Sequence, residues 1–157
     1  MGFKECGIIT FDMRVVGLDV GARRIGVAIS DTTATLARPL ETIVVTKGAT
    51  NLDESVDRVA ARIAELAAED DGLAAIVVGM PTRLDGTETE MTRVVAAFVD
   101  ALRARTPVPV VTEDERLTSV EAESRLASRE RDWKKRKDKL DAAAAAILLQ
   151  DYLDRKE

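Results

Sequence analysis

The chain has 157 residues, a formal net charge of −5 at pH 7, one cysteine and no histidine. The lack of histidine excludes Ser-His and Cys-His nucleophilic systems, and the single cysteine excludes a disulfide framework and cysteine-based zinc sites. Because the balance is acidic, binding of nucleic acid would need local basic patches or bound cations.

We expect residues 1–13 to be an N-terminal extension and residues 14–157 to form a single domain. The first residues have neither the long apolar run nor the cleavage site of a signal peptide. No apolar run approaches the ~20 residues that cross a bilayer, and the low cysteine content is typical of a reducing compartment. These features predict a cytoplasmic protein with no membrane partner.

The first elements predicted are a hairpin and an edge strand. Residues 14–20 and 25–30 are rich in Val and Ile and flank a turn that contains Gly21, which predicts a β-hairpin. A third strand is predicted over Leu36–Thr46, where Pro39 indicates a sheet edge or a bulge.

A helix, a strand and a loop are predicted next. Asn51 and Glu54 form a capping-box pattern ahead of apolar residues at helical spacing. These apolar residues are Leu52, Val56, Val59, Ile63 and Leu66. The apolar run 74–79 predicts a strand buried on both faces, and the Pro and Gly residues within 80–87 predict a loop.

The alternation of helices and strands continues. Thr87 and Glu90 form a second capping-box pattern before a helical run that contains Met91, Val95, Phe98 and Leu102. Residues 108–112 predict another buried strand, and Thr118 with Glu121 predicts the start of a short helix.

The C-terminal part predicts a loop followed by a helix. Residues 128–139 are dense in charge and lack apolar periodicity, so we expect a mobile loop. Residues 140–153 predict an alanine-rich, buried helix. The order of elements indicates an α/β fold with a mixed five-stranded sheet, three antiparallel strands followed by parallel strands, flanked by helices.

Three carboxylates occupy distinctive places. Asp19 lies towards the end of the first strand, Glu115 just beyond the fifth, and Asp141 at the start of the last helix. If the parallel strands align and their ends adjoin, Asp19 and Glu115 converge, and buried carboxylates favour a bound cation. Divalent cations held by carboxylates support phosphodiester hydrolysis without histidine. The alternative is that Asp19 is a turn or cap residue, that Glu115 is an exposed charge, and that Asp141 caps or complements the start of a helix. Spacing alone is weak evidence for catalysis.

Five segments follow one another along the chain: DVGARRIGVAISD, ARPLETI, VVGMPTRLDGTETEMT, DERLTSVEA and KLDAAAAAILL. In this order they resemble the signature segments of the YqgF/RuvX family, over about residues 14–153. The family is described as a candidate Holliday junction resolvase or, with better support in bacteria, as a nuclease that matures the 5′ end of pre-16S rRNA. The resemblance implies an RNase H-like fold and a metal-dependent nuclease, a hydrolase, in which Asp19, Glu115 and Asp141 are catalytic and bind Mg²⁺ or Mn²⁺.

Basic residues near these segments are candidates for binding nucleic acid. They are Arg23 and Arg24 in the hairpin turn, Arg83, Arg116, and Lys134, Lys135 and Lys137 beside Trp133. The alternatives are solvated charges and surface salt bridges. The segment that carries the lysines lacks the Gly-Gly turn of many family members. Gly21 is expected to supply a positive φ or a close backbone approach, and Gly26 to make room for substrate or a neighbouring strand.

The expected partners are structured RNA, branched DNA as an alternative, and pre-ribosomal particles. The oligomeric state is open between monomer and homodimer. Two other function classes remain. The DxGxxxxG pattern also resembles the phosphate-binding hairpin of actin-like and sugar-kinase ATPases, although those proteins combine two such lobes. The other class is a nucleic-acid-binding module that does not cleave.

Overall fold

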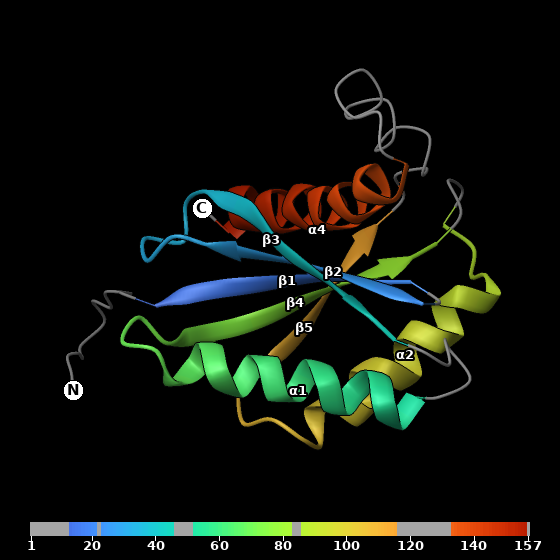
Figure 1. Ribbon diagram of the computed structural model, residues 1–157, viewed down its shortest axis with the longest axis horizontal. Helices are drawn as coiled ribbons and strands as arrows, with labels where there is room; N and C mark the ends of the chain where they lie inside the picture. The colour runs from blue at the N-terminus through green and yellow to red at the C-terminus, as the bar shows by residue number, and fades with distance from the viewer. Residues whose placement is uncertain (1–12, 22, 46–51, 83–85, 116–132, 157) are drawn as a thin grey trace.

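In the part of the chain that the structure describes, a five-stranded sheet lies between α1 (Leu52–Ala68) and α2 (Glu90–Arg103) on one face and α4 (Trp133–Lys156) on the other (Figure 1). The computed structural model describes residues 13–21, 23–45, 52–82, 86–115 and 133–156, with the backbone alone for 133–140 and 156. In chain order the elements are β1 (Arg14–Val20), β2 (Arg24–Ser30), β3 (Ala37–Val44), α1 (Leu52–Ala68), β4 (Leu73–Pro81), α2 (Glu90–Arg103), β5 (Val110–Glu115) and α4 (Trp133–Lys156).

The sheet has the strand order β3-β2-β1-β4-β5. The pairs β1–β2 and β2–β3 are antiparallel, and β1–β4 and β4–β5 are parallel. The predicted α/β fold with a mixed sheet is therefore confirmed. Pro39 lies on the edge strand β3 opposite Ala28, where the register shifts after Val27. The position therefore has both the sheet edge and the irregularity that the proline indicates.

Strand alternation divides the core into two layers. On one face, side chains such as Leu18, Val27 and Val78 pack against Val59 of α1 and Phe98 of α2. On the other face, α4 packs on a smaller apolar cluster. This second cluster consists of Val15, Ala28, Val77, Ala145, Leu148, Leu149 and Leu153. No helix in the described residues has the length and apolar content that crossing a membrane requires.

Two strand boundaries differ from the prediction because pairing continues beyond the apolar runs. β4 extends through Pro81, so the expected loop begins later than residue 80. β5 begins at Val110 and ends at Glu115, which pairs with Pro81. Glu115 is therefore the last residue of the strand rather than a residue beyond it.

The capping box predicted for the start of α2 involves the wrong residues. The N-cap is Thr89, not Thr87, and its reciprocal partner is Thr92, not Glu90. The Thr92 hydroxyl also donates to the carbonyl oxygen of Pro81 at 2.5 Å, so the cap ties the helix to the end of β4. Asn51 and the helix predicted from Thr118 lie outside the described residues.

The largest correction concerns the charged segment before the last helix. α4 begins at Trp133, so the loop predicted for 128–139 is wrong from that residue on. Lys, Arg and Asp without Gly or Pro are compatible with a helix even where apolar periodicity is missing. Asp141 consequently lies about 12 Å along the helix from Trp133, and the explanation of Asp141 as a helix cap fails.

Candidate active site

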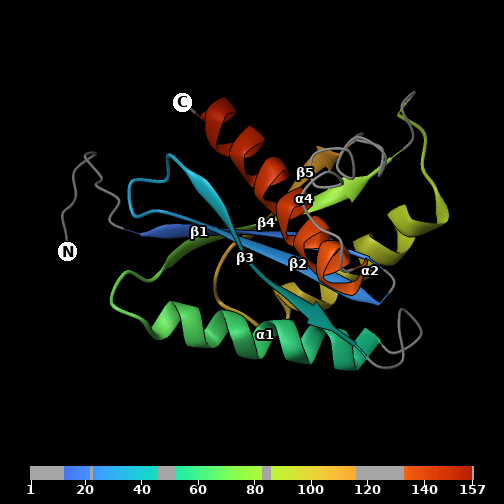
Figure 2. The same ribbon diagram turned by 45° about the horizontal axis from the view of Figure 1, so that its top comes forward.

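Asp19 and Glu115 share one face of the sheet, the face covered by α4. On β1, Asp19 alternates with Leu18 and Val20, which belong to the opposite core layer. On β5, Glu115 lies on the same side as Val111, which packs against the α4 cluster. Both carboxylates are therefore carried to the C-terminal edge of the sheet beneath one helix, which crosses the strands in Figure 2.

Gly26 is the residue that brings Asp141 to this edge. It pairs with Asp19 across the β1–β2 hairpin, and a Cβ on it would lie 2.0 Å from the carbonyl oxygen of Asp141. The backbone of α4 thus rests directly on β2, one strand away from Asp19. The expected close neighbour of Gly26 is a helix backbone, rather than substrate or another strand.

Glu115 reaches Asp19 across an intervening strand. The sequence prediction placed the ends of the first and fifth strands next to each other, but β4 separates them. A Cβ on Gly79 of β4 would lie 3.1 Å from Oε2 of Glu115 and 3.0 Å from Cδ2 of Leu148. Because Gly79 has no side chain, Glu115 can lie over β4 and hydrogen-bond to Asp19.

Burial and mutual repulsion raise the pKa values of these carboxylates. Burial, and then the negative charge of Asp141, raise the pKa of Asp19 from 3.8 to about 6, against a smaller lowering by the hydrogen bond with Glu115. Burial, followed by the charge of Asp19 and the same hydrogen bond, raises the pKa of Glu115 from 4.5 to about 8. At neutral pH Glu115 is therefore the protonated partner and donates to the Asp19 carboxylate.

The third carboxylate, Asp141, completes the cluster. Its Oδ2 atom is buried, and no hydrogen bond from the described residues reaches that atom, although the residue makes other interactions. In the described parts of the chain, no three His, Cys, Asp or Glu side chains form a group that could hold a metal ion as they stand. The donor set itself, a buried Asp19 repelled by Asp141 and hydrogen-bonded to a protonated Glu115, fits an oxygen-preferring divalent cation that would replace the Glu115 proton.

The predicted basic residues fall into three groups. Arg24 lies on the same face of β2 as Gly26, the α4 face. Arg23 is exposed in the hairpin turn, where its carbonyl oxygen accepts a hydrogen bond from the Val45 amide at 2.9 Å. The remaining predicted residues are Arg83 and Arg116, which lie outside the described residues, and Lys134, Lys135 and Lys137, for which only the helical backbone is described.

Gly21 makes a close backbone approach rather than a turn with positive φ. A Cβ there would lie 2.9 Å from the carbonyl oxygen of Arg24. Among the described glycines, those with positive φ are Gly72 and Gly86. The hairpin is therefore tight immediately after Asp19.

Two contributors to the site were missed in the sequence. Gly79 could have been found, since a glycine within a strand often marks the close approach of a ligand or another backbone. Asp151 of α4, whose charge contributes to the raised pKa of Glu115, carries no such signal. Its relation to Glu115 depends on how α4 crosses the sheet.

The family profile described as "RuvX: Holliday junction resolvase" matches residues 13–155. A protein of Chloroflexus aggregans is 44% identical over 143 residues, 91% of this chain and 94% of its own length. One from Anaeromyxobacter dehalogenans is 41% identical over 144 residues, 92% of this chain and 98% of its own. Both carry the name of a candidate pre-16S rRNA nuclease.

Solved structures resemble the chain at the level of the fold. T. thermophilus RuvC in complex with a Holliday junction substrate matches with a TM-score of 0.51 and 22% identity, over 92% of this chain and 95% of that one. The fowlpox virus Holliday junction resolvase matches with a TM-score of 0.54 and 16% identity, over 92% of this chain and 100% of that one. These matches confirm the RNase H-like fold, and together with the family profile and the relatives they show that the chain belongs to the RuvX family.

Proposed function

We propose that this chain is a divalent-metal-dependent nuclease that hydrolyses phosphodiester bonds and processes the 5′ end of pre-16S rRNA in the cytoplasm. The observation that carries the proposal is the meeting of Asp19, Glu115 and Asp141, from β1, β5 and α4, at one edge of the sheet. The substrate is inferred from relatives above 40% identity that bear the name of such a nuclease and match over nearly their whole length.

In this mechanism the three carboxylates hold Mg²⁺ or Mn²⁺. When bound, one or two such ions activate a water molecule and stabilise the leaving oxygen of the phosphodiester. Glu115 would have to lose its proton to serve as a ligand, and the missing side chains of Gly26 and Gly79 allow the carboxylates to lie close together.

Basic residues near the carboxylates bind the phosphate groups of the substrate in this proposal. Arg24, on the α4 face, is the described residue best placed to hold a phosphate beside Asp19. The full proposed set is Arg23, Arg24, Arg83, Arg116, Lys134, Lys135 and Lys137. Cations at these positions offset the acidic character of the chain as a whole.

The test is cleavage of an RNA that carries the 5′ leader of pre-16S rRNA, with Mg²⁺ or Mn²⁺ and with EDTA. Asp19→Asn should abolish cleavage and leave the fold intact. Asp100→Asn removes a carboxylate that is 81% exposed on α2 and serves as the matched control. Cleavage by Asp19→Asn at the parent's rate would contradict the mechanism.

A second function is favoured by the description of the matching family profile, that of a Holliday junction resolvase. Resolution of a four-way junction requires two active sites acting together, hence a homodimer. The same variants assayed on a four-way junction, with the mass measured in solution, separate the two substrates. Binding that persists in EDTA without cleavage under either metal would indicate a module that binds nucleic acid without cutting it.

A further inference from the structure

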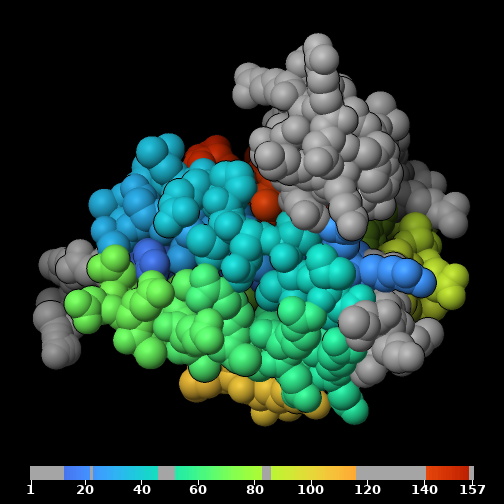
Figure 3. All heavy atoms as spheres, viewed as in Figure 1, coloured from blue at the N-terminus to red at the C-terminus, as the bar shows by residue number. Residues whose placement is uncertain are grey.

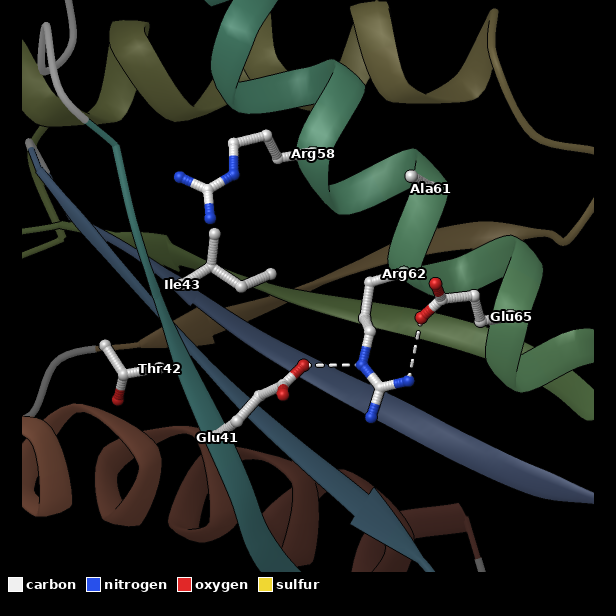
Figure 4. Close-up of a pocket in the computed structure, with 7 residues that line it drawn as sticks. All are labelled: Glu41, Thr42, Ile43, Arg58, Ala61, Arg62 and Glu65. Carbon is white, nitrogen blue, oxygen red and sulfur yellow. Dashed lines mark hydrogen bonds and ion pairs between the residues drawn. The ribbon is translucent and has the colours of Figure 1, made fainter.

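A groove separate from the carboxylates lies between β3 and α1. Its volume is about 370 Å³, within the range of sites for small ligands. The two elements lie next to each other on the molecular surface in Figure 3. The lining residues, drawn in Figure 4, are Glu41, Thr42, Ile43, Arg58, Ala61, Arg62 and Glu65. We call it the β3–α1 groove.

One end of this groove, lined by Glu41, Arg62 and Glu65, presents hydrogen-bond acceptors. Arg62 pairs with Glu41, from Nε to Oε2 at 2.6 Å, and with Glu65, from Nη1 to Oε1 at 3.0 Å. Each ion pair engages one oxygen of its carboxylate, which leaves the second oxygen to accept from a ligand. Ile43 contributes an apolar surface between the charged groups (Figure 4).

The other end of the groove, which we call its mouth, carries the exposed side chain of Arg58. Arg58 donates to the carbonyl oxygen of Val44, and among the described residues no carboxylate pairs with it. In Figure 4 its guanidinium lies above Ile43, away from the cluster formed by Glu41, Arg62 and Glu65. The charge of Arg58 is therefore available to an anion at this end.

The same end of the groove adjoins the hairpin turn beside Asp19. Val44, which Arg58 contacts, pairs with Arg24, and the amide of Val45 donates to the carbonyl oxygen of Arg23. Adjacent strands lie about 4.8 Å apart. Arg24, Arg23 and Arg58 thus follow one another from the α4 face, around the turn, to the α1 face.

We propose that the β3–α1 groove is a subsite for one unpaired nucleotide of the RNA strand, outside the point of cleavage. Arg58 holds a phosphate at the mouth, and the second oxygens of Glu41 and Glu65 accept hydrogen bonds from the amino group of the base. Unpaired bases present their edges for such contacts. This subsite rests on the proposed function, since it takes the strand that the carboxylates cut.

An extended peptide added to β3 fits the groove less well. Strand addition uses the free carbonyl and amide groups of a sheet edge. Arg58 already occupies the Val44 carbonyl, and a neutral peptide backbone would leave the Arg58 charge unmatched. The charge of Arg58 at the mouth therefore favours a phosphate.

The test measures RNA binding in an Asp19→Asn background, without cleavage, with a long single-stranded RNA that spans both places and a short one that covers only the carboxylate site. Arg58→Ala should weaken binding of the long RNA, lower the salt slope of log K by about 0.7, as expected for the loss of one phosphate contact on a single strand, and leave the short RNA unaffected. Arg58→Lys should retain most of the binding. For the long strand, oligo-C should bind more tightly than oligo-U, which has no amino group on its base.

Arg38→Ala is the matched control. Arg38 is an exposed arginine near the opposite end of the same strand, so its removal changes the net charge equally. Circular dichroism and unfolding curves verify that each variant is folded. The subsite would be overturned if Arg38→Ala and Arg58→Ala weakened RNA binding equally, or if Arg58→Ala affected the long and the short RNA equally. It would also be overturned if a peptide competed for the groove while Arg58→Ala left RNA binding unchanged.

The two proposals fail in different ways. If the parent protein cleaves RNA and Arg58→Ala binds the long strand as tightly as the parent, the subsite alone is contradicted. If the parent protein cleaves nothing with Mg²⁺ or Mn²⁺ but Arg58→Ala weakens binding of the long strand, the nuclease proposal is contradicted and the subsite is supported.

Discussion

The backbone of Asp141 lies directly against Gly26, so closely that a Cβ on Gly26 would sit 2.0 Å from the Asp141 carbonyl oxygen. Because Gly26 also pairs with Asp19, this contact sets the position of α4 relative to the first strand. A helix backbone cannot yield as a flexible side chain can. The separation of two candidate metal ligands thus depends on one missing methyl group.

Gly26→Ala should therefore displace α4 and separate Asp141 from Asp19. We expect a loss of about 1–3 kcal/mol in the free energy of unfolding, as for other overpacked sites, and a loss of cleavage larger than that destabilisation explains. Gly17→Ala is the control, since its Cβ would meet Leu149 Cβ at 2.8 Å further along the same helix. Unfolding curves and cleavage rates of the two variants provide the comparison, and equal activity at equal stability would contradict this role for Gly26.

Gly79→Ala should act on Glu115 rather than on Asp141. The new methyl group would meet two side chains, Glu115 at Oε2 and Leu148 at Cδ2, at 3.1 and 3.0 Å. Side chains can shift by a few tenths of an ångström, so we expect a stability loss of only about 1 kcal/mol but a weaker affinity for Mg²⁺ or Mn²⁺. Titration of the metal measured by calorimetry checks the prediction, and an unchanged affinity would contradict it.

Removal of a carboxylate should stabilise the metal-free protein at alkaline pH. The folded state raises the pKa of Asp19 from 3.8 to about 6, so the folded protein keeps a proton that the unfolded chain has lost. The associated stability is present below pH 3.8 and disappears as pH rises through about 6. In EDTA at pH 8, Asp19→Asn should therefore raise the free energy of unfolding by on the order of 1–3 kcal/mol.

At pH 3 the same variant should have no advantage, because Asp19 is then protonated in both states. Denaturant unfolding at the two pH values provides the measurement, with Asp100→Asn as the variant that should show neither effect. A less stable Asp19→Asn at pH 8 would show that burial and the charge of Asp141 do not disfavour the ionised form of Asp19.

Metal binding should release a proton. Glu115 is protonated at neutral pH because its pKa is raised to about 8, and a ligand carboxylate must be deprotonated. The affinity for Mg²⁺ should therefore increase as pH rises towards 8, and the binding enthalpy should depend on the ionisation enthalpy of the buffer. Calorimetry in two buffers tests this, and Glu115→Gln should abolish the buffer dependence.

Much of this architecture is predictable from the sequence because the apolar pattern is strong. Val and Ile runs define the strands, and Pro39 indicates the edge. What could not be predicted is where pairing or helix formation continues through polar residues. β5 extends to Glu115 because β4 pairs with it, and α4 begins at Trp133 although no apolar repeat is present there.

The sequence indicates which carboxylates are candidates for the site, but not the path by which they approach one another. Asp19 interacts with both Glu115 and Asp141, yet Glu115 reaches it over Gly79 because β4 lies between the two strands that carry the carboxylates. Strand order is a long-range property that local patterns do not contain. The same holds for Asp151, whose effect depends on the path of α4.

The placement of Asp141 on α4 has a consequence for the newly made chain. A polypeptide synthesised only as far as β5 contains Asp19 and Glu115 but lacks the third carboxylate and the helix that covers them. Its apolar strip on that face, with Val15, Ala28 and Val77, would still be open to water. Addition of α4 therefore supplies the third carboxylate of the proposed site and covers the second core layer in the same step, so an unfinished chain would have neither.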